Sequence, residues 1–280
     1  MAIRRPAVAG AFYAASPESL RKQIIDCFNH PLGPGRLPGA KTDAEVLSVV
    51  CPHAGYMYSG PAASHSYLAL SEQKTPETVV IIGPNHTGWG TPVSVMREGI
   101  WKTPLGEVTI DTELADKIID IFPTARSDES AFIREHSVEV QIPFLQFIYP
   151  DFKFVPICMG YQDLQTSTGL GNAIYEASKN KEIIVVASSD LTHQEPKASA
   201  NKKDQYVLDA ISEMDEKKLQ ESVHRHHITT CGYGCISAAL VYSKLRKATN
   251  AEILTYYTSG DIIGDNSAVV GYASAKITRK

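Results

Sequence analysis

The chain has 280 residues, of which 43% are hydrophobic and 21% are charged, with a formal net charge of -4 and a pI near 6.1. This is ordinary globular composition, and a chain of this length buries a sizeable core. The acidic balance provides no basic stripe that would displace counterions, so we do not expect nucleic-acid binding. The one short basic cluster, at 224–227, is interpreted as a solvated loop.

The compartment follows from what the chain does not contain. Its longest apolar runs, such as IIVVAS at 183–188, have the length of a strand and fall far short of the roughly 20 residues that span a bilayer. The N-terminal stretch carries two arginines without the apolar run of a signal peptide. Five cysteines, an odd number, argue against a disulfide framework. We therefore expect a cytoplasmic protein without a membrane segment.

The first predicted helix starts at Ser16, a residue suited to an N-cap, with Pro17 at the first helical position. Leu20, Ile24 and Cys27 then form one apolar face. The stretch 31–41 contains three prolines and three glycines and predicts an exposed loop.

Strands and helices alternate along the rest of the chain. Unalternating apolar runs, typical of strands buried on both faces, lie at 46–51, 78–83, 152–158 and 182–188. Helical patterns lie between or after them at 64–72, 112–121, 138–147, 164–177, 200–214 and 232–245. Two closing strands, at 251–259 and 268–277, are expected to be antiparallel at the sheet edge. We predict one α/β domain over residues 1–280, a mostly parallel sheet flanked by helices.

Polar side chains follow three of the buried strands. His53 comes just after the first strand, His86 just after the second, and Asp190 and His193 just after the fourth. In open α/β sheets the ligand crevice lies beyond the carboxyl ends of the strands. Topology alone is therefore expected to gather these residues in one place.

Cys231, in ITTCGYGC, lies at the start of a predicted helix. The positive end of the helix dipole favours its thiolate form, and a thiolate with two imidazoles suits iron, copper or zinc. Cys235 lies one turn further on, and this spacing differs from the C-x2-C of a zinc knuckle, so we assign it to the core. Cys51 and Cys158, inside strand patterns, are assigned to the core as well.

His136 and Glu139 are three residues apart and share a face if a helix has begun by His136. Each of these residues also has a simpler interpretation. Histidines after strands are often surface residues, Cys231 suits a small buried apolar group, and Asp190 suits the cap of the next helix. Spacing alone thus predicts a polar pocket and leaves open whether the pocket holds a metal.

Several ordered blocks carry a resemblance to a known family. Over nearly its whole length, from Arg4 to Ala275, the sequence resembles the Memo family. The matching blocks are RRPAVAGAFY, CPHAGYMYSG, GPNHTGWG, WKTPLGEV, REHSVEVQIPFL, SSDLTH, TTCGYG and YYTSGDIIGDNSAVVGYASA.

The resemblance implies a fold and a ligand set. Memo proteins look like the catalytic subunit of class III extradiol dioxygenases, which implies a single phosphorylase/hydrolase-like α/β domain. The family's metal ligands, two histidines and a cysteine, fall on His53, His86 and Cys231. The dioxygenases have a carboxylate where Memo has the cysteine, and no Asp or Glu occurs in ITTCGYGC.

The resemblance also implies roles for the remaining polar residues. Asp190 and His193 match acid/base positions, and His193 resembles the acid/base residue of the dioxygenases. His136 and Glu139 match a pocket-lining motif. Bacterial and archaeal relatives belong to AmmeMemoRadiSam gene neighbourhoods, which implies an AMMECR-type protein and a radical SAM protein as partners.

Two functions remain open at this point. The first is a redox enzyme in which iron or copper binds His53, His86 and Cys231; a zinc hydrolase ranks below it. The second is a binding module for a peptide or a small molecule, in which the same pocket takes a phosphate, a carboxylate or a peptide side chain. In that module aromatic neighbours would supply apolar contact, namely Tyr56, Tyr58, Trp89 and Trp101.

Overall fold

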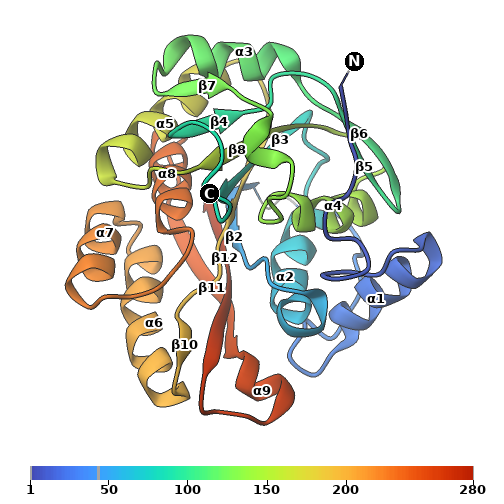
Figure 1. Cartoon of the computed structure of the whole chain (residues 1–280), viewed down its shortest axis with the longest axis vertical. Helices are drawn as coiled ribbons and strands as arrows, with labels where there is room; N and C mark the ends of the chain where they lie inside the picture. Colours follow the sequence, from blue (N-terminus) through green and yellow to red (C-terminus); the bar gives the residue numbers. More distant parts are fainter. Residues whose placement is uncertain (1, 43–44, 280) are drawn as a thin grey trace.

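The computed structural model describes residues 2–42 and 45–279, which form an α/β fold around a mixed sheet. Its strands are β2 (Glu45–Cys51), β3 (Thr78–Pro84), β4 (Val93–Val95), β7 (Ala125–Ser127), β8 (Lys153–Met159), β9 (Ile183–Ser188), β10 (His193–Glu195), β11 (Asn250–Thr258) and β12 (Val269–Arg279). In the described residues the order is β10-β12-β2-β9-β3-β8-β4-β7, and β11 pairs with β12 (Figure 1).

The sheet is parallel at its centre and antiparallel on either side. β2, β9, β3 and β8 pair in parallel, and they are the four strands that the unalternating apolar runs predict. β4 joins β8 in antiparallel orientation, and β12 joins β2 in the same way. The α/β fold is thus confirmed, and so is the antiparallel orientation of the two closing strands.

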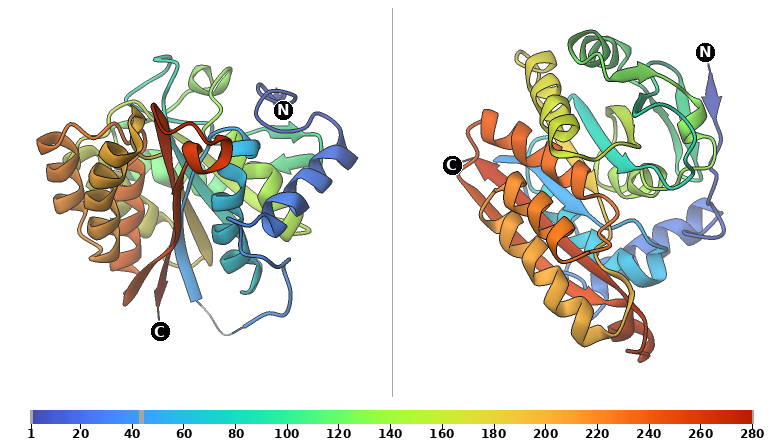
Figure 2. Two further views of the ribbon diagram at one scale, coloured as in Figure 1. Left: turned by 90° about the horizontal axis from the view of Figure 1, so that it is seen from below. Right: turned by 60° about the vertical axis from the view of Figure 1, so that its left-hand side comes forward.

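Helices cover both faces of the sheet, and each face has its own buried apolar cluster. One face carries α3 (Thr112–Ile121), α5 (Leu164–Ala177), α6 (Lys197–Ser212), α7 (Glu216–Arg225) and α8 (Tyr233–Leu245). The other carries α1 (Pro17–Asn29), α2 (Tyr56–Ser71) and α4 (Ile142–Ile148). Figure 2 shows α6 to α8 on one side of the strands and α1 and α2 on the other. Cys51, Cys158 and Cys235 are fully buried, as predicted.

A second, smaller sheet was not predicted. It joins β1 (Ile3–Arg4), β5 (Ile100–Thr103) and β6 (Gly106–Thr109), and β1 pairs with β5 in parallel. A two-residue strand whose partner lies far along the chain leaves no local pattern. The short helix α9 (Ser259–Ile263) follows β11. No helix within the described residues has both the length and the apolar character that crossing a membrane demands.

Helix α2 begins at Tyr56, well before the predicted start at residue 64, and it contains Pro61. The Ala62 N–H donates to the Tyr257 hydroxyl at 3.0 Å, and that hydroxyl donates to the Tyr58 carbonyl at 2.7 Å. The hydroxyl thus stands between the two groups that would bond directly in an unbroken helix. Because proline disfavours helix interiors, a local pattern could not reveal these turns.

Two other expectations need correction. The helix predicted over 138–147 begins only at Ile142, with Pro143 in its first turn and a 3-10 turn, η2 (Glu139–Gln141), before it. His136 and Glu139 therefore do not share a helical face. The basic cluster predicted as a loop is divided, because His224 and Arg225 form the last turn of α7.

Asp111 ties α3 to the sheet. Its carboxylate caps the helix by accepting the Leu114 N–H at 3.2 Å, and it also accepts the Thr78 hydroxyl and the Lys181 ammonium group. Only 3% of Asp111 is exposed. Burial alone would raise the pKa of Asp111, but the hydrogen bonds from Lys181 and Thr78 outweigh it and hold this pKa below its ordinary value.

Replacing Asp111 with Asn keeps the cap and removes the charge, so we expect the free energy of unfolding to fall by about 2 kcal/mol at neutral pH. A carboxyl whose pKa is depressed by folding contributes stability above its unfolded pKa of about 3.9, and this contribution is lost as pH falls through the folded pKa. Urea denaturation of both proteins should show the difference shrinking in acid. Glu113→Gln, at an exposed ion pair of α3, should leave stability unchanged. A difference independent of pH would contradict this account.

Candidate metal site

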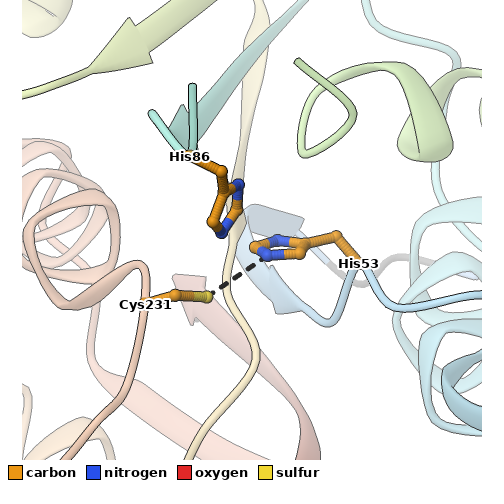
Figure 3. Close-up of side chains that lie close together, drawn as sticks. All are labelled: His53, His86 and Cys231. Carbon is orange, nitrogen blue, oxygen red and sulfur yellow. Dashed lines mark hydrogen bonds between the residues drawn. The ribbon is translucent and has the colours of Figure 1, made fainter. Parts of the chain in front are cut away.

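The structure brings His53, His86 and Cys231 together from three loops. His53 follows β2, His86 follows β3, and Cys231 lies in the turn before α8. Their ligand atoms all lie within 4.8 Å of one another, and the His53 Nε2 is 3.2 Å from the Cys231 Sγ (Figure 3). The His53 side chain is 1% exposed and that of His86 is 33% exposed, so the site opens to solvent on the His86 side.

The hydrogen-bond network fixes the tautomer of His53. Its Nδ1 is 2.8 Å from the Ser188 hydroxyl, which also accepts the Gln141 Nε2 at 2.8 Å. The single Ser188 proton goes to the Ser137 carbonyl at 2.7 Å, so the Nδ1 of His53 must be the donor. The lone pair of its Nε2 therefore faces Cys231.

Glu135 fixes the position of the ring proton of His86. Its carboxylate accepts the His86 Nδ1–H at 2.9 Å and the His86 backbone N–H at 2.6 Å. It also accepts the N–H groups of His136 and Ser137, each at 2.9 Å. Burial opposes the charge, but the hydrogen bonds from His86 and Ser137 lower the pKa of Glu135 to about 2. Glu135 is therefore ionised and accepts the Nδ1–H of His86, so Nε2 is the ring nitrogen of His86 that can bind an ion.

A second group, His86 with Glu135 and His136, also has its ligand atoms within 4.8 Å of one another. The Glu135 oxygens already accept four hydrogen bonds, so this carboxylate is better suited to orienting His86 than to binding an ion. The first group, with the Nε2 atoms of two imidazoles and a sulfur, is the better candidate. Sequence reasoning missed Glu135, although it directly precedes His136, and it missed Ser188 and Gln141.

Cys231 departs from its expected ionisation. Burial raises the pKa of the Cys231 thiol, and the nearby Asp190 charge acts in the same direction, so the thiolate is disfavoured in the metal-free protein. The N-cap of α8 is Gly232, which leaves Cys231 before the helix proper, where burial outweighs the helix dipole. Burial also lowers the pKa of His53, with His136 and His86 adding to the effect, so this imidazole is neutral. A bound cation would reverse the balance at the sulfur, because a metal ion displaces the thiol proton.

Asp190 and His193 lie at this site but are not partners of each other there. One Asp190 oxygen accepts the backbone N–H of His53 at 2.8 Å and that of Ala54 at 3.4 Å. His193 donates its Nδ1–H to the Thr229 carbonyl at 3.0 Å and its backbone N–H to the Thr229 hydroxyl at 2.7 Å. Thr229, and not Asp190, orients His193. Asp190 is no helix cap either, since α6 begins only at Lys197.

His136 and Glu139 have separate surroundings. The His136 ring lies 5.4 Å from that of His53 and 4.7 Å from that of His86, measured between centroids. Burial lowers the pKa of His136 to about 4, against the opposite effect of the Glu135 carboxylate.

The Glu139 carboxylate serves the N-terminal segment. It accepts hydrogen bonds from the Arg4 guanidinium at 2.7 Å and the Tyr13 hydroxyl at 2.6 Å. It also accepts the backbone N–H groups of Ala7 and Val8. This segment places the Phe12 ring 4.6 Å from that of His136, so Glu139 acts on the site through the segment that it anchors.

The aromatic residues expected around the pocket separate into two groups. Trp101 is 0% exposed and Tyr56 is 3% exposed, and both pack in the apolar cluster on the α1 and α2 face. Trp89 is 47% exposed and lies under the Arg134 guanidinium, 5.5 Å from its ring centroid. Tyr58 is half-buried in α2.

Over nearly its whole length the chain is similar to proteins of one family. A family model described as Memo-like protein matches residues 4–276. A MEMO1 family protein of Methanopyrus kandleri is 48% identical over 280 residues, covering 99% of both chains. One from Methanobrevibacter smithii is 47% identical over 277 residues, covering 97% of this chain and 98% of the relative. Among solved structures, an uncharacterized protein of Escherichia coli K12 covers 83% of this chain and 99% of its own, with a TM-score of 0.59 at 15% identity, a likeness of fold alone.

The tautomers of the metal-free protein are open to measurement. Long-range proton–nitrogen NMR of protein labelled at histidine nitrogens should show Nδ1–H at both His53 and His86, with a bare Nε2 at His53. Glu135→Gln puts an amide N–H among groups that all donate, so the Nε2–H form of His86 should rise while His53 is unchanged. Glu129→Gln, at an exposed residue, is the control. A dominant Nε2–H form at both histidines of the unaltered protein would contradict the assignment.

Proposed function

Because the chain belongs to the Memo family, we propose that it binds one redox-active metal ion, iron or copper, between His53, His86 and Cys231. The observation that carries the proposal is the convergence of three ligand atoms within 4.8 Å, two of them on imidazoles whose Nδ1 atoms are held by Ser188 and Glu135. A thiolate with imidazoles is a donor set that suits these metals.

The surroundings of the three residues fit an ion. Three protein ligands leave coordination positions for a further ligand, and the exposed side of His86 gives access to them. When bound, such an ion supplies one-electron transfer or the activation of dioxygen. The chain contributes fixed ligands, since Ser188 orients His53 and Glu135 orients His86. The Asp190 N–H, 3.3 Å from the Cys231 Sγ, stabilises the sulfur as it loses its proton.

His193 and His136 are the groups we assign to proton transfer. With its Nδ1–H held by Thr229, His193 keeps a free Nε2 to accept a proton, and it lies close enough to His53 to lower the pKa of that residue. His136 is neutral near pH 7, because its pKa is about 4, and its ring borders both histidine ligands. Asp190 and Glu139 take positioning roles, Asp190 on the His53 loop and Glu139 on the N-terminal segment.

A second candidate function is a binding module that takes an anionic group in the same pocket. The Arg134 guanidinium over the exposed Trp89 ring supports it, because Arg134 adjoins Glu135 and Trp89 lies in the loop that carries His86. The Arg134 guanidinium suits a carboxylate or phosphate, and the Trp89 ring supplies apolar contact to an anionic peptide or small molecule. Such a module would bind its ligand with or without metal.

Anaerobic equilibrium dialysis of the reduced protein against Fe(II), Cu(I) or Zn(II) tests the first function. We expect one ion per chain, and a loss of affinity of more than about 100-fold in both His53→Ala and Cys231→Ser, because each removes a ligand. His224→Ala, at an exposed histidine of α7, should bind as the unaltered protein does.

Stoichiometry and competition separate the outcomes. Tighter binding of iron or copper than of zinc in a ligand-dependent manner supports a redox role, whereas a preference for zinc favours the hydrolase. Binding that is equal in the unaltered protein and both ligand variants would refute the metal site and leave the anion-binding module.

A further inference from the structure

We propose that Gln162 is the positioning residue that holds the Cys231 sulfur in the geometry needed for metal binding. This inference rests on the proposed metal-binding function. Gln162 lies in the loop between β8 and α5, beside the turn that carries Cys231, and none of the sequence motifs includes it.

The side chain of Gln162 spans the Cys231 turn from one end to the other. Its Nε2 donates to the Cys231 carbonyl at 2.7 Å, and its Oε1 accepts the Gly234 N–H at 2.9 Å. A carbonyl only accepts and a backbone N–H only donates, so the two contacts together fix which way the amide points. The amide of Gln162 thus bridges Cys231 and the first turn of α8 by two hydrogen bonds.

Two glycines allow the turn to be held this closely. A Cβ added at Gly234 would lie 2.6 Å from the Gln162 Cβ, so only glycine admits the glutamine at this distance. On the opposite side, a Cβ added at Gly232 would lie 2.4 Å from the Ser188 carbonyl, and the Gly232 N–H donates to the Ser189 hydroxyl at 2.9 Å. The turn is therefore wedged between the ends of β8 and β9.

The backbone of Gln162 is held by hydrogen bonds from two helices. Its carbonyl accepts the Gln220 Nε2 of α7 at 2.8 Å and the Ser167 hydroxyl of α5 at 3.2 Å. Gln220 is only 4% exposed, and the same Nε2 lies 3.2 Å from the Ser237 hydroxyl of α8. Side chains from three helices thus fix the position of Gln162, and the hydrogen bond from Gln162 in turn fixes the Cys231 backbone.

The positions of His53 and His86 do not depend on the hydrogen bonds of Gln162. His53 is oriented by Ser188 and His86 by Glu135, and Gln162 bonds to none of these four residues. Removing the Gln162 side chain should therefore loosen the sulfur and leave both imidazoles in place. The sulfur–metal bond is the quantity that should respond.

Anaerobic titration of the reduced protein with Co(II) tests this, because a thiolate bound to cobalt gives a charge-transfer absorption band. We expect Gln162→Ala to weaken Co(II) binding by about 10- to 100-fold and to reduce that band. Gln162→Glu keeps an acceptor for Gly234 but no donor for the Cys231 carbonyl, so it should reduce the band too. Gln205→Ala, at a glutamine of α6 bonded to Asp209, is the matched control and should change neither.

Alkylation of the metal-free protein by iodoacetamide gives a readout that needs no metal. Cys231 is partly exposed, whereas the other cysteines of the described chain are buried. Mass spectrometry should show that Cys231 is modified faster in Gln162→Ala than in the unaltered protein. The thermal unfolding midpoint of Gln162→Ala should equal that of the Gln205→Ala control. If the alanine variant does not fold, Gln162→Glu serves for both measurements.

The two proposals fail in different ways. Equal Co(II) binding by the unaltered protein and Cys231→Ser would refute the metal site, and the alkylation rate would still decide whether Gln162 holds the turn. A cobalt band that depends on Cys231 but is unchanged in both Gln162 variants would overturn the positioning role and leave the metal site standing.

Discussion

The buried Asp190 is the residue on which the arrangement of the candidate site depends. Its carboxylate accepts the His53 N–H at 2.8 Å, and its own N–H lies 3.3 Å from the Cys231 Sγ. Burial raises the pKa of Asp190, while the hydrogen bond from His53 acts against that rise. Because Asp190 follows β9, which pairs with β2, one residue near the centre of the sheet holds both the His53 loop and the Cys231 turn. Gln162 and Glu135 complete this support from either side.

The electrostatics of the site follow from the same burial. His53 and His136 are neutral at pH 7, and Glu135 is ionised, because hydrogen-bond donors surround its carboxylate. The Cys231 thiol is protonated in the absence of a cation. His53, His136 and Cys231 therefore contribute no positive charge to the site at neutral pH.

The sequence allowed the sheet centre to be predicted because strands buried on both faces leave unalternating apolar runs. It allowed His53, His86 and Cys231 to be grouped because strand ends meet at one edge and the Memo blocks name the same residues. It did not reveal Glu135 or Ser188, whose partners lie 49 and 135 residues away. The prediction that Cys231 is a thiolate was wrong, because a helix start in the sequence does not show how deeply the sulfur is buried. Glu139, close to His136 in sequence, turns toward the N-terminal segment because a 3-10 turn replaces the expected helix.

The hydroxyl of Tyr257 that is inserted into α2 has a consequence for the order in which the chain matures. Its partner Tyr58 lies 199 residues earlier, in the helix that begins soon after His53. During synthesis the first turns of α2 emerge from the ribosome long before β11. The Tyr58 carbonyl and the Ala62 N–H can therefore bond to the Tyr257 hydroxyl only when the chain is nearly complete. The start of α2, which follows the His53 loop, therefore completes its hydrogen bonds only late in folding.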